Sequence, residues 1–254
     1  MLAQYLPGEL FAFMLVFARI GAGVMLLPGI GETYVFRRVR LALALALTLV
    51  IFPLVRDGLP GQPDTPWALA VLVSGEVLYG LFIGATTRLM LSALHVAGTV
   101  IAFQSSLAYA MTVDPNQGVQ GALIGALMTM VGVVLIFTTG LHMMMIGAIY
   151  DSYTLFPPGS PPPTDSIAQL VIGIVASSFT VGMQMATPFV VFGIAFYIGL
   201  GLLQRLMPQV QLFFSAIPLQ ISFAFFLLMA VLPASMMWFV NHFEATIVNL
   251  LNPI

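Results

Sequence analysis

The stretch SIAQLVIGIVASSFTVGMQMATPFVVFGIAFYIGLGLLQ, residues 166–204, holds 39 consecutive residues without a charged side chain. Arg205 ends it, and a second run of 38 uncharged residues follows. A helix needs about 20 apolar residues to cross the hydrocarbon core of a membrane. At about 1.5 Å of rise per residue, each run would be nearly twice as long as one crossing if it formed a straight helix. We therefore predict that each run bends or turns back, at Pro188 in the first and at Pro218 and Pro233 in the second.

The composition of the whole chain agrees with these runs. Of 254 residues, 60% are hydrophobic and 6% are charged, whereas an ordinary soluble domain carries about 25% charged residues. Seven arginines and nine acidic residues could not cover the surface of a soluble fold of this size. The chain is therefore predicted to be an all-α membrane protein, built of helical hairpins with broken helices. Its outer face would meet lipid or other apolar protein.

Several classes of function are disfavoured at the same stage. The net charge is −2 and lysine is absent, so the chain has no basic footprint for nucleic acid. The absence of cysteine excludes disulfides, thiolate metal sites and cysteine nucleophiles. The three histidines, His95, His142 and His242, do not stand at metal-ligand spacing, and no phosphate loop or nucleophile elbow is present. We expect no catalytic residue, no metal and no cofactor.

Three further apolar segments precede the long runs. They are Leu10–Leu27, Leu41–Val55 and Trp67–Met90. The arginines at 37, 38 and 40 lie between the first two, and the positive-inside rule would place them in the cytoplasm. The proline-rich segment Phe156–Asp165 then divides the chain into two parts.

Three charges fall inside the predicted helices. Glu76 and Arg88 are twelve residues apart, about 18 Å along one helix, so they cannot pair with each other. Arg19 has no carboxylate three or four residues away and needs a partner on another helix, a polar cavity or a place near the interface. We interpret Glu76 and Arg88 as interfacial or snorkelling side chains.

Small residues four apart allow helix backbones to approach closely inside a membrane. Gly80 and Gly84 form one such pair, and Gly121 and Gly125 form another. With 23 glycines in the chain, pairs at this spacing also arise by chance. Whether either pair marks an interface stays open.

Two polar segments interrupt the apolar chain. Residues 102–121 carry amides, serines and the turn-forming Asp114-Pro115-Asn116, which suits either a surface loop or a loop entering a cavity. The segment from Arg205 to Pro218 is either a plain connection between hairpins or a constriction. Its candidate residues are Arg205, Pro208, Gln209, Phe213, Phe214 and Pro218.

Several motifs occur together in one order along nearly the whole chain. They include Ala18-Arg19-Ile20, Gln104 followed by Asp114-Pro115, and Arg205-Leu-Met-Pro208-Gln209. In this respect the chain resembles the FliR/SctT family, the flagellar biosynthetic protein FliR and its relatives in type III secretion. The resemblance implies a subunit of a protein export gate in the bacterial inner membrane, within the flagellar basal body. Its partners would be P- and Q-type subunits in a hetero-oligomeric helical pore, the B-type export switch protein and unfolded flagellar proteins.

The resemblance also implies roles for parts of the chain. Residues 1–156 would be the P-component-like part and residues 165–254 the Q-component-like hairpin part. A plug loop of the pore maps onto about Ser106 to Gly121, where the family often has glycine in place of Ser106. The residues of this plug and its approach are Gln104, Ser106, Leu107, Tyr109, Met111, Val113, Asp114, Pro115 and Asn116. The alternative is a small-solute transporter with broken helices and a site near the midplane of the membrane.

Overall fold

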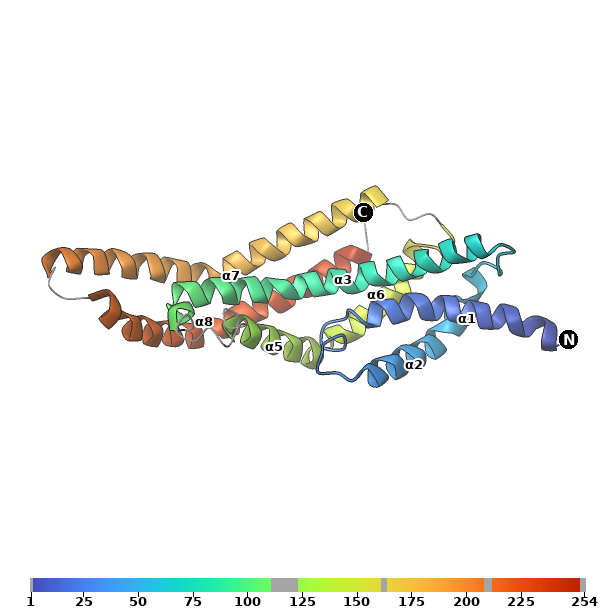
Figure 1. Ribbon diagram of the computed structural model, residues 1–254, viewed down its shortest axis with the longest axis horizontal. Coiled ribbons are helices and arrows are strands. Elements are labelled where there is room, and N and C mark those ends of the chain that lie inside the picture. Colours follow the sequence, from blue (N-terminus) through green and yellow to red (C-terminus); the bar gives the residue numbers. More distant parts are fainter. Residues whose placement is uncertain (1, 111–122, 161–163, 208–211, 252–254) are drawn as a thin grey trace. The chain divides into compact units, whose positions relative to one another are not determined.

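The computed structural model describes residues 2–110, 123–160, 164–207 and 212–251. All regular elements in these residues are helices (Figure 1), which confirms the predicted all-α class. In chain order they are α1 (Leu2–Val24), α2 (Arg37–Val55), the 3-10 helix η1 (Arg56–Gly58), α3 (Pro66–Gln104), α4 (Leu107–Ala110), α5 (Leu123–Thr138), α6 (Leu141–Leu155), α7 (Thr164–Leu206) and α8 (Leu212–Leu251).

Four stretches of the described chain are long and apolar enough to cross a membrane: Arg37–Gly58, Pro66–Gln104, Ile167–Leu206 and Ser215–Leu250. Helices α5 and α6 meet at an angle of 75°. If this bent pair is counted as one broken span, it is the fifth. Gly140 precedes α6 with a φ of +80°, a left-handed conformation that glycine adopts without strain. A broken helix therefore exists, at a glycine that the sequence pattern did not single out.

Helix α3 is longer than predicted. The expected span ended at Met90, soon after the charge of Arg88, but the helix continues to Gln104. Arg88 does not end it because its side chain is about half exposed and lies 3.5 Å from the carboxylate of Glu32. A charged residue on an outward face leaves the helix free to continue.

The two longest helices also differ from expectation. Helix α7 has 43 residues and passes through Pro188, and α8 has 40 residues and passes through Pro218 and Pro233. The prediction left a bend or a reversal open at these prolines; the chain does not turn back at any of them, and both helices continue through them. An internal proline removes one backbone hydrogen bond and kinks a helix without having to end it, and Figure 1 shows α7 changing direction near its middle.

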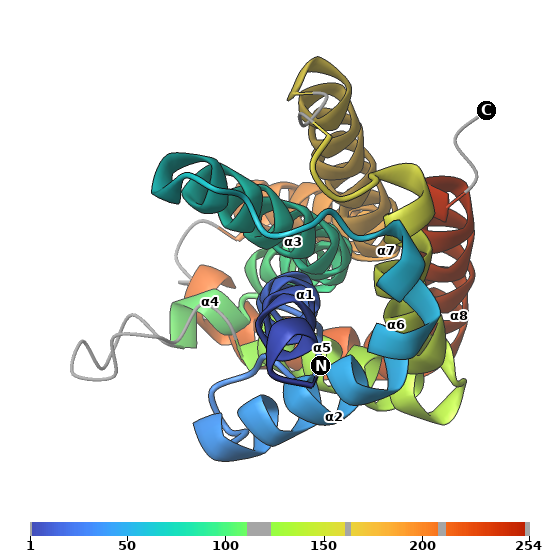
Figure 2. The same cartoon turned by 90° about the vertical axis from the view of Figure 1, so that its right-hand side faces the viewer.

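The chain forms two compact units. Unit 1 comprises residues 1–90, 136–174 and 244–254, and unit 2 comprises residues 91–135 and 175–243. In unit 1, α1 packs along α2 and against α6 (Figure 2). Its buried side chains include Leu15, Val16, Ile20, Val24, Ile83, Met145 and Ile149. Those of unit 2 include Leu94, Ala97, Ile101, Met128, Met185, Phe189, Phe239 and Phe243.

The pair Gly80 and Gly84 is an interface between α3 and α1. A Cβ atom on Gly80 would overlap the main-chain oxygen of Arg19, and one on Gly84 would lie 2.7 Å from the main-chain oxygen of Gly23. The backbones of the two helices therefore touch at both glycines. Of the other pair, Gly121 lies outside the described residues.

Candidate functional site

The predicted plug region begins where α3 ends, in unit 2. Gln104, Ser106 and Leu107 are described in full, and Tyr109 is described by its backbone in α4. The remaining plug residues lie outside the described residues: Met111, Val113, Asp114, Pro115 and Asn116. The structure therefore describes the base of the segment, and its role as a plug stays a prediction.

Helix α3 ends because Ser106 adopts a left-handed conformation, with a φ of +57°. The Ser105 N–H still reaches the carbonyl of Ile101 at 2.9 Å, and the Ser106 N–H turns to the carbonyl of Phe103 at 3.4 Å. Helices commonly end on a left-handed residue, and that residue is usually glycine because a Cβ atom is disfavoured there. Serine at this position therefore needs a compensating interaction.

Gln220 of α8 supplies that interaction. Its Oε1 atom accepts a hydrogen bond from the Ser106 hydroxyl at 2.7 Å, and its Nε2 atom donates to the main-chain oxygen of Gln104 at 2.7 Å. Ser106 and Gln220 are almost fully buried, at 1% and 2% exposure. The last carbonyls of a helix lack partners within it, so a side chain 116 residues away satisfies one at the end of α3. The sequence pattern did not single out Gln220, although it is an amide inside an uncharged run of 38 residues.

Helix α7 contacts the same base. The side chain of Gln104 lies against the backbone of α7 at Gly193, where a Cβ atom would overlap its Oε1 atom. The hydroxyl of Tyr197 lies 3.5 Å from that of Ser106. The end of α3 is therefore enclosed by both α7 and α8.

The far end of the connection is also fixed in unit 2. Helix α5 starts at Leu123, and a Cβ atom on Gly98 of α3 would overlap the backbone nitrogen and Cα of Gly125. A Cβ atom on Gly125 would in turn lie 3.0 Å from Nδ1 of His95. Helices α3 and α5 thus touch backbone to backbone close to both ends of the segment between them.

The second predicted region, from Arg205 to Pro218, is described in part. Arg205 is exposed in the last turn of α7, and Pro218 is exposed inside α8. Phe213 and Phe214 are described by their backbone alone, and Pro208 and Gln209 lie outside the described residues. A constriction in this region stays a prediction.

A buried ion pair in unit 1 was not foreseen. Arg19 of α1 is fully buried, and its Nε and Nη2 atoms donate to the two carboxylate oxygens of Glu76 in α3 at 2.7 and 3.0 Å. Arg19 thus has its partner on another helix, one of the three possibilities left open. The interpretation of Glu76 as a snorkelling side chain is wrong, because its side chain is 1% exposed and paired with Arg19. It is buried because α1 brings a guanidinium to it, and spacing within α3 could not reveal this.

The remaining donors of Arg19 bind the end of α6. Nη1 donates to the main-chain oxygen of Ser152 at 3.0 Å and lies 3.2 Å from its hydroxyl, and Nη2 donates to the main-chain oxygen of Phe156 at 2.9 Å. The rings of Tyr153 and Tyr79 lie 4.1 and 4.9 Å from the guanidinium carbon. One arginine therefore joins α1, α3 and the C-terminus of α6, where a cation is favourable.

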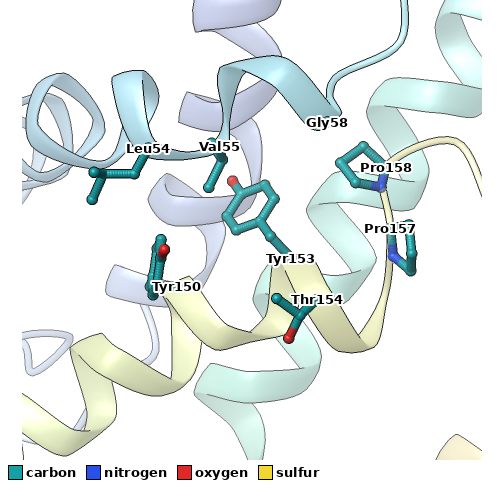
Figure 3. A pocket seen from close by; sticks show the side chains of 8 residues that line it. All are labelled: Leu54, Val55, Gly58, Tyr150, Tyr153, Thr154, Pro157 and Pro158. Carbon is teal, nitrogen blue, oxygen red and sulfur yellow. The ribbon is translucent and has the colours of Figure 1, made fainter.

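A cavity of about 230 Å³ adjoins this centre. Figure 3 shows side chains of α2, α6 and the residues after α6 around it, with Tyr153 among them. The lining is mainly apolar: Leu54, Val55, Gly58, Tyr150, Tyr153, Thr154, Pro157 and Pro158. Among the described residues, no three histidine or acidic side chains lie close enough together to hold a metal ion.

Comparison with known proteins identifies the family of this chain. The family model described as bacterial export proteins, family 1, matches residues 10–246. The chain belongs to this family. It is 38% identical over 213 residues to the flagellar biosynthetic protein FliR of Caulobacter vibrioides, covering 84% of this chain and 85% of that one.

Two relatives with lower identity also match most of this chain. The FliR protein of Bacillus subtilis is 27% identical over 95% of this chain and 93% of its own. The Yop proteins translocation protein T of Yersinia pestis is 23% identical over 90% of this chain and 88% of its own. The family match includes Arg19, Glu76, Ser106 and Gln220, so both centres lie inside the family region.

Proposed function

We propose that this chain is a subunit of the flagellar type III protein export gate in the bacterial inner membrane, within the basal body. The observation that carries the proposal is the 38% identity to a flagellar FliR protein over 84% of the chain. The identity to the Yop translocation protein is 23%, which favours the flagellar system over the injectisome.

In this proposal the chain forms a pore with P- and Q-type subunits and contacts the B-type export switch protein. Residues 1–156 are its P-like part and residues 165–254 its Q-like hairpin part. The long helices support an assembly: the 43 residues of α7 amount to about 64 Å measured along the helix, roughly twice the thickness of the hydrocarbon core. Large apolar side chains along α7, among them Ile194, Ile198, Leu202 and Leu206, are exposed and need lipid or apolar protein to cover them.

The segment from Ser106 to Gly121 is the proposed plug. A gate must stop water and ions and still yield to a moving polypeptide, and apolar side chains such as Met111 and Val113 can seal by excluding water. The anchoring of α3 at Gln220 and its close contact with α5 at Gly98 support this role. Fixed helix ends allow the loop between them to move without unfolding a helix.

The subunit role is tested by affinity purification. A tagged copy of the chain, produced in a flagellated bacterium from which the corresponding gene has been deleted, should restore export and copurify with P- and Q-type proteins in detergent. A tagged chain that does not restore export and does not copurify with these proteins would contradict the proposal. The solute-transporter alternative instead expects uptake of a specific solute into vesicles that hold the purified chain alone.

The plug role is tested by deletion. Removing Ser106–Gly121 should raise ion leakage through the assembled gate, because no apolar segment then excludes water from the pore. Leakage is measured as loss of membrane potential in cells that assemble the variant gate. A deletion variant that assembles normally and leaves the potential unchanged would rule out this plug.

A further inference from the structure

We infer that Gln220 is a positioning residue that sets how the chain leaves α3, and that it links the α7–α8 hairpin to the segment beginning at Ser106. The inference rests on the proposed plug for its consequence in export, but its geometry stands without it. The hydroxyl of Ser106 and the carbonyl of Gln104 are both bound by one amide of α8, at 2.7 Å each.

Gln220 lies inside α8, within a stretch apolar enough to cross a membrane, and is 2% exposed. A buried amide is costly unless its donor and acceptor both find partners. Here the two partners are Ser106 and Gln104, both at the end of α3, so these hydrogen bonds hold Gln220 against that helix end.

Ser106 has a left-handed backbone conformation. A φ of +57° is disfavoured for any residue with a Cβ atom. The hydrogen bond to Gln220 holds the serine in this conformation, and a glycine would adopt it without help. Loss of Gln220 therefore leaves a strained serine and an unpaired helix carbonyl, both of which favour a different exit from α3.

Helix α7 touches Gln104 at Gly193, and Tyr197 of α7 faces the Ser106 hydroxyl. A displacement of α7 or α8 thus changes the contacts of residues 104 and 106 directly. The hairpin in the C-terminal part controls the first residues of the proposed plug through these contacts.

The test uses a single introduced thiol, because the chain has no cysteine. Leu107→Cys is placed one residue after Ser106 in the full chain, and the purified assembled gate is labelled with a small water-soluble maleimide. In this background Gln220→Leu and Ser106→Ala should each raise the labelling rate by about ten-fold, the change expected when a buried hydrogen bond is lost. Their combination should add little to Gln220→Leu alone, because both changes break one shared bond.

Two variants separate positioning from packing. Ser105→Ala is the matched control: Ser105 is equally buried, but its hydroxyl bonds to Ala102 of its own helix at 3.2 Å, so labelling should not change. Ser106→Gly should label more slowly than Ser106→Ala, because glycine relieves the left-handed strain. A role in packing alone predicts the reverse order, since glycine leaves the larger void.

Unchanged labelling in Ser106→Ala and Gln220→Leu would overturn the inference, and so would equal effects of Ser105→Ala and Ser106→Ala. If Gln220→Leu does not accumulate in membranes, the order of Ser106→Ala, Ser106→Gly and Ser105→Ala decides alone. Membrane potential is recorded for the same variants and for the deletion of residues 106–121. Altered labelling with normal potential in all of them supports the positioning role and contradicts the plug instead.

Discussion

Replacing Glu76 by leucine is expected to lower the stability of the folded chain by about 3–5 kcal/mol, the usual cost of removing one partner from a buried ion pair. Arg19 would keep its charge at 0% exposure, and its remaining partners among the described residues are uncharged: the hydroxyl of Ser152, the carbonyls of Ser152 and Phe156, and the rings of Tyr79 and Tyr153. Net stabilities are commonly about 5–15 kcal/mol, so a large share would be lost. Thermal unfolding of the purified protein in detergent, followed by helical circular dichroism, measures the change.

The exposed pair Arg56 and Glu9 is the matched control. Both side chains are about half exposed, and an exposed ion pair contributes about 0–1 kcal/mol, so Glu9→Leu should change the melting temperature little. The double variant Arg19→Leu with Glu76→Leu should recover part of the stability, because no unpaired charge remains. Equal melting temperatures for Glu76→Leu and Glu9→Leu would show that the buried centre does not hold α1, α3 and α6 together.

Gly98→Ala is expected to have the second large effect, a destabilisation of about 1–3 kcal/mol or more. The added Cβ atom would overlap the backbone of Gly125, which cannot move aside as a flexible side chain can. Helices α3 and α5 must then separate near both ends of the proposed plug. Lower thermal stability and a raised ion leak are the expected measurements.

Gly75→Ala provides the opposite expectation on the same helix. Apart from the backbone of its own helix, none of the described residues lies within 4 Å of a Cβ atom at Gly75, and alanine is favoured over glycine in a helix interior by about 1 kcal/mol. This variant should be as stable as the unmodified chain or more so. A Gly98→Ala protein that behaves like Gly75→Ala would contradict the close contact of α3 and α5.

Composition was enough to predict a helical membrane protein. A chain with 6% charged residues cannot cover the surface of a soluble domain, and a helix satisfies its own backbone hydrogen bonds inside lipid. The path of the helices was harder to predict. Pro188 indicates a bend or a reversal of the chain, but α7 continues through it with one backbone hydrogen bond fewer. The break came at Gly140, a residue type too common in this chain to single out.

The polar centres show the same limit. Arg19 and Glu76 are 57 residues apart, and Ser106 and Gln220 are 114 apart. Hydrogen bonds between residues so far apart in the chain depend on how the helices pack against one another. The pattern of a single sequence does not reveal this packing. Through its resemblance to a family the sequence singled out Gln104 and Ser106, and both lie at the end of α3. It did not indicate the side chain that holds this helix end.

Conductance of the reconstituted gate tests the proposed plug most directly. The complex containing this chain is placed in a planar lipid bilayer, alongside complexes with residues 106–121 deleted or with Ser105→Ala. A closed unmodified gate, a closed Ser105→Ala gate and a conducting deletion gate are the predicted result. A deletion gate that assembles fully and conducts no more than the unmodified one would contradict a plug that begins at Ser106.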